Sequence, residues 1–232
     1  MSSPADHNPE ELLVRWWQRY TAIDQDDGLA TDRRHAITAP FGQTCPELTP
    51  ALAASADPDA VAEQHLRDFL LHNAHLHLGL VAASGGADAL AAVGWNGPLN
   101  YDGDTATFAA VVRDWENRFG ARVVSVGLAT PHLSVAAPPA RHEDALLVAA
   151  EHFAFCPDTI WQGSYSTLAA YAESLFDAKC WEFWWDCPGR PICERRSFSR
   201  WTPRRPVVCV MAGERAGHDA PPPPPAGGNR RE

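Results

Sequence analysis

Lysine is nearly absent from this chain of 232 residues, in which Lys179 stands beside 18 arginines. Basic residues are outnumbered as a class, because 29 Asp and Glu against 19 Lys and Arg give a net charge of −10. A general nucleic-acid binder needs clustered basic residues for its phosphate contacts, so we expect no nucleic-acid partner. The preference for Arg, together with abundant Ala, Pro and Gly, is typical of a GC-rich bacterial coding sequence.

Long apolar runs and paired cysteines are also missing. No apolar run approaches the 18 residues of a membrane span, and Asp6, Glu10 and Glu11 lie where a secretory signal carries basic residues. We therefore expect a cytoplasmic protein without a membrane partner. None of the six cysteines belongs to a Cys-x-x-Cys pair, and free thiols are expected in a reducing compartment.

Apolar residues recur at helical spacing in five segments. They predict helices over residues 9–21, 58–73, 105–119, 141–155 and 166–177. The helix over 105–119 has the best-defined ends, because Asp104 is suited to cap its start and Gly120 to end it in a left-handed conformation.

Five shorter segments show alternating or continuous apolar residues typical of strands. They are residues 75–81, 89–95, 122–128, 132–137 and 181–185. In the first of these, Leu76, Leu78 and Leu80 are expected to face the core. His75 and His77 are expected to face the other way, where solvent-facing histidines are a simpler interpretation than a metal site.

The order of these elements predicts an α+β domain, with helices packed on a single mostly antiparallel sheet. We assign the domain to residues 38–186, and an N-terminal helix with its connector to residues 1–37. Residues 187–232 are rich in Arg and Pro, lack periodicity and are expected to be a disordered tail. Two interpretations of this tail stay open: it binds an acidic or polyproline-binding partner, or it is an out-of-frame readthrough product.

Five motifs recur in the predicted domain in a pattern that ordinary core packing does not require. They are Gly94-Trp95 with Asn100, Arg113-x-Trp115-Glu116-x-Arg118-Phe119-Gly120-Ala121, Glu151-His152-Phe153-Ala154-Phe155-Cys156-Pro157-Asp158, Trp161-Gln162-Gly163 and Trp181-x-Phe183-Trp184-Trp185-Asp186. Through them, residues 77–186 resemble a bacterial domain family of unknown function, DUF4253. The resemblance implies a compact cytoplasmic domain without an assigned reaction, cofactor or partner.

Candidate catalytic groups are concentrated between Glu151 and Asp158. His152 and Cys156 are four residues apart, so their side chains share a helix face and could hold a metal or activate a thiolate. A buried thiol beside a hydrogen-bonded core histidine is the structural alternative. Glu151 lies in a largely apolar helix. Its carboxylate either forms an ion pair with Arg113 or Arg118, or it acts as a general base. No zinc-ligand spacing is recognised, and we assign no metal and no cofactor.

Candidate binding residues combine aromatic and polar side chains. Alternation over 181–185 places Trp184 and Asp186 on the strand face opposite the core. Together with Trp161 and Gln162, they could line a groove for a ligand or a partner peptide, whereas the alternative is that they fill the core.

Three functional hypotheses follow. The leading one is a non-catalytic protein- or ligand-recognition module, because the chain has no nucleophile elbow, phosphate loop or metal signature. The second is a hydrolase that uses Glu151 or Asp158 with His152 or a bound metal. The third is an acidic immunity-type or regulatory partner of a basic protein, since residues 1–186 hold 25 acidic and 10 basic residues.

Overall fold

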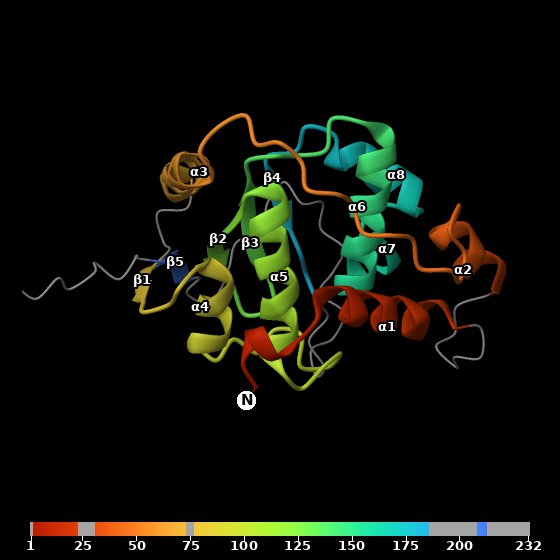
Figure 1. The fold of residues 1–232 in the computed structure, drawn as a ribbon, viewed down its shortest axis with the longest axis horizontal. Helices are drawn as coiled ribbons and strands as arrows, with labels where there is room; N and C mark the ends of the chain where they lie inside the picture. Colours follow the sequence, from red (N-terminus) through yellow and green to blue (C-terminus); the bar gives the residue numbers. More distant parts are fainter. Residues whose placement is uncertain (1, 23–30, 73–76, 186–207, 213–232) are drawn as a thin grey trace, which may run out of the picture.

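The computed structural model describes residues 2–22, 31–72, 77–185 and 208–212 (Figure 1). They form an α+β fold, as predicted. After a short 3-10 helix at Pro4–Asp6, the helices are α1 Pro9–Thr21, α2 Thr31–Thr38, α3 Pro58–His72, α4 Gly86–Ala92, α5 Thr105–Phe119, α6 His142–Phe155, α7 Asp158–Trp161 and α8 Leu168–Leu175. The strands are β1 His77–Val81, β2 Ala121–Val126, β3 Pro131–Val135, β4 Cys180–Glu182 and β5 Val208–Ala212. No helix among these residues is long and apolar enough to span a membrane.

The strands form one sheet in the order β1-β5-β2-β3-β4. β1 and β5 are parallel, and the other neighbouring pairs are antiparallel, so the sheet is mostly antiparallel as predicted. β5 comes from the segment for which the sequence predicts disorder, and at these five residues the structure differs from that expectation. The remaining residues of the tail lie outside the described part of the chain.

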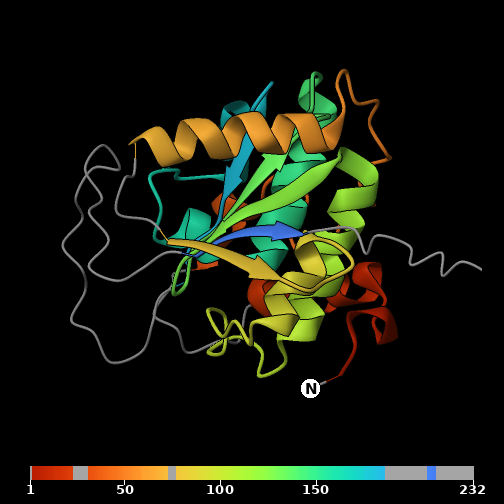
Figure 2. The same cartoon turned by 90° about the vertical axis from the view of Figure 1, so that its left-hand side faces the viewer.

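Helices cover both faces of the sheet. α3 lies to the left of the sheet and runs across its strands, contacting β2 and β3, and α6 lies to the right (Figures 1 and 2). Between the sheet and α6, the ring of Trp115 on α5 stacks on Phe183 with centroids 5.4 Å apart, and it meets Phe155 of α6 at 4.8 Å. This aromatic core holds the second half of the chain together, since each fully buried large side chain stabilises the fold by about 1.5–3 kcal/mol.

Both predicted ends of α5 are confirmed. The Asp104 side chain accepts a bond from the Ala106 N–H, and Gly120 has a left-handed φ of 58°. A Cβ at Gly120 would lie 2.9 Å from Pro58 Cγ and 3.0 Å from Ala136 Cβ, so both backbone conformation and space require glycine.

Two predictions at the edge of the sheet are wrong. Residues 89–95 were expected to form a strand, but Gly86–Ala92 forms the helix α4. Alanine has the highest helix propensity, and the Glu116 carboxylate, distant in sequence, accepts a bond from the Ala87 N–H in the first turn. Leu80 was expected to face the core but is 81% exposed, because β1 is an edge strand beyond the helices that cover the centre.

The N-terminal region contributes more than one appended helix. α2 lies where a connector was expected, and Arg34 on it donates to the Tyr20 carbonyl at the end of α1 at 2.7 Å. α1 itself contacts α5 and α6. Leu13 and Trp17 on α1 are fully buried, so this helix belongs to the same core as the predicted domain.

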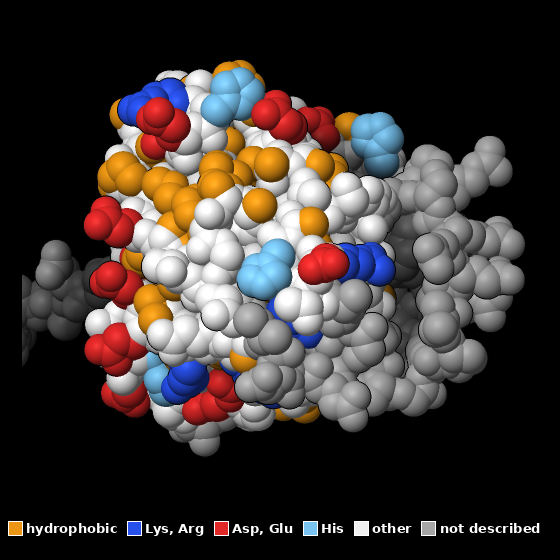
Figure 3. All heavy atoms as spheres, turned by 90° about the vertical axis from the view of Figure 1, so that its right-hand side faces the viewer, with side chains coloured by type: hydrophobic (Ala, Val, Ile, Leu, Met, Phe, Trp, Pro, Cys, Tyr) orange, Lys and Arg blue, Asp and Glu red, His pale blue; other side chains and the backbone are white. Residues whose placement is uncertain are grey.

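The side of the molecule on which α2, α7 and α8 lie carries hydrophobic side chains in its upper part, with charged groups around them (Figure 3). Phe176, which follows α8, is 40% exposed and stacks on His142. Scattered apolar groups are ordinary on a protein surface, so the candidate site is built below from the polar motif residues.

Candidate functional site

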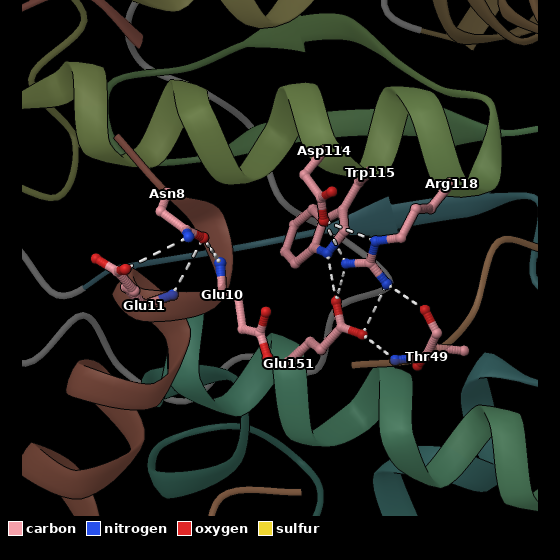
Figure 4. Close-up of polar contacts among 8 residues, drawn as sticks. All are labelled: Asn8, Glu10, Glu11, Thr49, Asp114, Trp115, Arg118 and Glu151. Atoms are coloured by element: carbon pink, nitrogen blue, oxygen red, sulfur yellow. Dashed lines mark hydrogen bonds and ion pairs between the residues drawn. The ribbon is translucent and has the colours of Figure 1, made fainter. Parts of the chain in front are cut away.

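Arg118 and Glu151 form a buried ion pair between α5 and α6 (Figure 4). Two bonds join them, from Nη1 to Oε1 at 3.0 Å and from Nη2 to Oε2 at 2.6 Å. The carboxylate also accepts from Trp115 Nε1 at 2.8 Å and from the Thr49 N–H at 2.9 Å. Arg118 donates in addition to Asp114 and to the Thr49 carbonyl. Of the two alternatives for Glu151, this geometry is that of a structural ion pair.

The other polar residues of the same motif also hold neighbouring elements in place. Arg113 forms an ion pair with Asp88 on α4. Glu116 accepts from the Ala87 N–H at 3.0 Å, and its burial raises the pKa of this carboxyl above its usual value. The motif on α5 therefore fixes α4 as well as α6.

His152 and Cys156 are both fully buried in the core, where each bonds to a different partner. His152 is fully buried, its Nδ1 lies 2.9 Å from the Tyr171 hydroxyl, and its ring contacts Trp181 at 4.4 Å. Burial holds the pKa of His152 well below its usual value, so the imidazole is neutral. The Cys156 thiol donates to the Trp184 carbonyl at 2.9 Å.

Burial raises the pKa of the Cys156 thiol to about 12. This is the opposite of the depressed pKa that a reactive cysteine needs, so the thiol is protonated at neutral pH. Among the described residues, no group of three or more His, Cys, Asp or Glu is arranged to hold a metal ion.

Asp158 lies in a different cluster of polar and aromatic groups, at the start of α7. It is 1% exposed, and it accepts from the Tyr101 hydroxyl at 2.7 Å and from Gln162 Nε2 at 2.9 Å. The Tyr20 ring lies between Trp161, at 5.5 Å, and Tyr101, at 5.9 Å. Burial and the neighbouring Asp158 carboxylate raise the pKa of Tyr101, so its hydroxyl stays protonated as a donor.

Tyr101 is also one wall of an open cleft of about 540 Å³. The cleft is lined by His7, Arg15, Trp16, Arg19, Tyr101, Asp102, Gly103 and Thr107. It therefore lies between α1 and the chain that leads into α5. Arg19 Nη1 donates to the Tyr101 carbonyl at 2.9 Å, which joins the two walls.

The segment before α1 closes one end of this region. The Ser2 hydroxyl donates to Asp104 Oδ2 at 2.5 Å and lies 2.6 Å from His7 Nε2. These bonds lower the pKa of Asp104 and fix its charge beside the start of α5. The floor of the cleft is rigid, since Trp16 stacks on Phe108 with ring centroids 4.9 Å apart.

The comparison with protein families matches residues 77–186 to the model described as Domain of unknown function (DUF4253). Residues 77–186 are a DUF4253 domain. The resemblance drawn from the five motifs is thereby confirmed. No curated protein and no solved structure matches the chain.

The DUF4253 domain brings together only part of the residues predicted for the site. Asp158 and Gln162 are hydrogen-bonded to each other. The Trp161 ring contacts Tyr20, whose ring also contacts Tyr101, the donor to Asp158. Glu151 and His152 are directed elsewhere, each to partners of its own. Trp184 follows the end of β4 and is 37% exposed, as the alternation over residues 181–185 predicts, and Asp186 lies outside the described residues.

Sequence reasoning missed the residues that line the cleft. Arg15 and Arg19 are one turn apart on α1 and precede the DUF4253 domain, and Tyr101 follows the motif residue Asn100. The signal that could have pointed to them is the pair of arginines at helical spacing on the exposed face of α1. Their meeting with Tyr101 depends on a contact across more than 80 residues, which no local pattern encodes.

Proposed function

We propose that this protein is a non-catalytic recognition module that binds a small ligand in the cleft between α1 and residues 101–107. The observation that carries the proposal is the bond from Tyr101 to Asp158. It links a buried carboxylate of the DUF4253 motif to a wall of the cleft, so the motif orients a residue that a ligand would touch.

The dimensions and lining of the cleft support this proposal. Its volume of about 540 Å³ falls within the range of small-molecule sites. The buried ring of Trp16, stacked on Phe108, lines it together with polar groups, of which Arg15 is 62% exposed and Asp102 is half-buried. A rigid floor reduces the ordering cost of binding, and exposed polar groups supply specificity.

The hydrolase hypothesis gains no support from the same geometry. Glu151 is occupied by Arg118, Trp115 and Thr49, and His152 is neutral and fully buried. A general base must reach the proton that it removes, and neither group lines the cleft. The third hypothesis, an acidic partner of a basic protein, rests on net charge alone.

The proposal is tested by filling the cleft at Gly103. Gly103 lines the cleft, and a Cβ at this position meets nothing within 4 Å, so the fold has room for a larger side chain there. We expect Gly103→Phe to block binding and Gly103→Ala, the matched control, to preserve it. The measurement is thermal-shift screening of the full chain against a panel of metabolites of varied charge, followed by calorimetric titration of the hits.

At least one chemical class is expected to bind wild type and Gly103→Ala equally and Gly103→Phe about tenfold more weakly or worse. Two results would count against the proposal: a panel without any hit, or hits whose affinity for Gly103→Phe is unchanged.

A further inference from the structure

We propose that the ligand of this cleft carries an oxyanion, a carboxylate or a phosphate, that pairs with the guanidinium of Arg15. This inference rests on the function proposed above and adds the chemical class of the ligand. It starts from a contrast in charge. The chain as a whole has a net charge of −10, whereas the cleft is lined by two arginines and a histidine against one carboxylate, Asp102.

The two cleft arginines have different tasks. Arg19 donates to the Tyr101 carbonyl at 2.9 Å and so holds the two walls together. Among the described residues Arg15 has only a loose partner, since its Nη2 lies 3.6 Å from Asp102 Oδ2, a separation longer than a hydrogen bond. Its guanidinium is therefore the group with donors to offer to a ligand.

Arg118 shows how a guanidinium in this protein looks when a carboxylate of the fold already satisfies it. Its side chain is 13% exposed and makes two bonds to Glu151, at 2.6 and 3.0 Å. Arg15 is 62% exposed and has no comparable pair. The planar fork of an arginine matches the geometry of carboxylate and phosphate oxygens, so an incoming oxyanion can complete the arrangement at Arg15 that Glu151 completes at Arg118.

The neighbouring acidic group does not oppose this assignment. Asp104 does not line the cleft, and its carboxylate accepts bonds from the Ser2 hydroxyl and the Ala106 N–H. Asp102 weakens attraction for an anion and favours one that approaches Arg15 from the open side. The cleft is open and Arg15 is 62% exposed, so we expect modest affinity, which added salt lowers by screening.

The test uses four ring compounds of similar size and different charge. Benzoate and phenyl phosphate carry the two oxyanions, benzamide is the neutral counterpart and benzamidine is the cation. Each is titrated into the full 232-residue chain, and the indole N–H resonance of Trp16 on the cleft floor is followed by NMR. We expect benzoate or phenyl phosphate to shift this resonance at lower concentration than the other two, and the better of them identifies the oxyanion.

Arg15→Gln is expected to weaken binding of the anion about fivefold, because it removes a charge-assisted interaction at an exposed position. Arg67→Gln is the matched control, since Arg67 is also an exposed helix arginine, 68% exposed, with one acidic neighbour. The Arg67→Gln variant should bind the anion with the same affinity as wild type.

Three results would overturn the inference. Benzamide or benzamidine binds as well as the anions, Arg15→Gln binds the anion as well as Arg67→Gln, or none of the four compounds shifts Trp16. The first two leave the cleft a binding site and so leave the proposed function standing. The proposed function falls by its own test, if the metabolite panel gives no hit or if the hits bind Gly103→Phe with unchanged affinity.

Discussion

Two arginines on neighbouring helices, Arg118 on α5 and Arg15 on α1, occupy opposite kinds of environment. Arg118 is half-buried and shares two bonds with Glu151, whereas Arg15 is exposed at a cleft and lies 3.6 Å from the closest Asp102 oxygen. The first belongs to the DUF4253 motif and the second precedes it. The difference teaches that the most distinctive residues of the domain build its scaffold, and that the groups offered to solvent lie beside them.

The largest expected effect comes from breaking the buried pair. Arg118→Met removes the cation that pairs with Glu151, a residue that is 4% exposed in the wild-type structure. We expect a loss of about 3–5 kcal/mol in the free energy of unfolding, because the buried carboxylate loses this partner. Arg67→Met on the exposed face of α3 is the control and should change stability by less than about 0.5 kcal/mol. Urea unfolding measures both, and equal stability of the two variants would remove the distinction between the arginines.

The second expected effect is a dependence of stability on pH. It comes from His132, on the face of the sheet that α3 covers. Burial and the neighbouring His65 lower the pKa of His132 from 6.5 to about 4, and its ring also faces Phe69 and Glu182. Because the folded pKa lies below the unfolded one, the unfolded chain binds the proton more tightly. Stability linked to His132 is complete above pH 6.5 and is lost as the pH falls toward 4, by up to about 3 kcal/mol.

His132→Phe removes this group, so its stability relative to wild type should rise as the pH falls from 6.5 to 4. Burial raises the pKa of Glu182 and so works in the opposite direction, but that contribution is present in both proteins. His142→Phe, at an exposed histidine, serves as the control. Parallel pH profiles of wild type and His132→Phe in chemical denaturation would contradict the prediction.

Features that depend on interactions between nearby residues were predicted correctly from the sequence, whereas features that depend on distant residues were missed. The helix over 105–119 was predicted with both ends, because Asp104 and Gly120 act on residues next to them. α4 was missed because the carboxylate that supports its first turn comes from Glu116, 29 positions away from Ala87. The neighbours of Glu151 were partly predicted, since Arg118 was named as a partner, but Thr49 was not.

The cleft shows the same limit more strongly. Asp158, Trp161 and Gln162 were predicted as site residues from the motifs, and they lie near one another but do not line the cleft. One wall of the cleft comes instead from α1, which the sequence indicated only as an appended helix. Its packing against residues 101–107 depends on contacts such as Arg19 to Tyr101, and no periodicity in either segment specifies them.

The smallest expected effect comes from breaking the bond that connects the scaffold to the cleft. Tyr101→Phe removes the hydroxyl that donates to Asp158, a carboxylate that is 1% exposed, and we expect a loss of about 2 kcal/mol in unfolding free energy. The same variant should weaken ligand binding, because the cleft wall loses its anchor. A variant with wild-type stability and wild-type binding would show that this bond does not connect the two regions.

The central claim is that the Glu151 carboxylate of the DUF4253 motif is structural, while the cleft serves binding. A comparison of Glu151→Gln with Arg15→Gln in urea unfolding tests this claim most directly. Glutamine at position 151 removes the carboxylate charge that four donors share, and it leaves Arg118 paired with Asp114 but not with the core carboxylate, so we expect this variant to lose about 3 kcal/mol or more. Arg15→Gln should stay within about 0.5 kcal/mol of wild type. If Glu151→Gln is instead as stable as wild type, the carboxylate is not held by the fold in this way, and the account is contradicted.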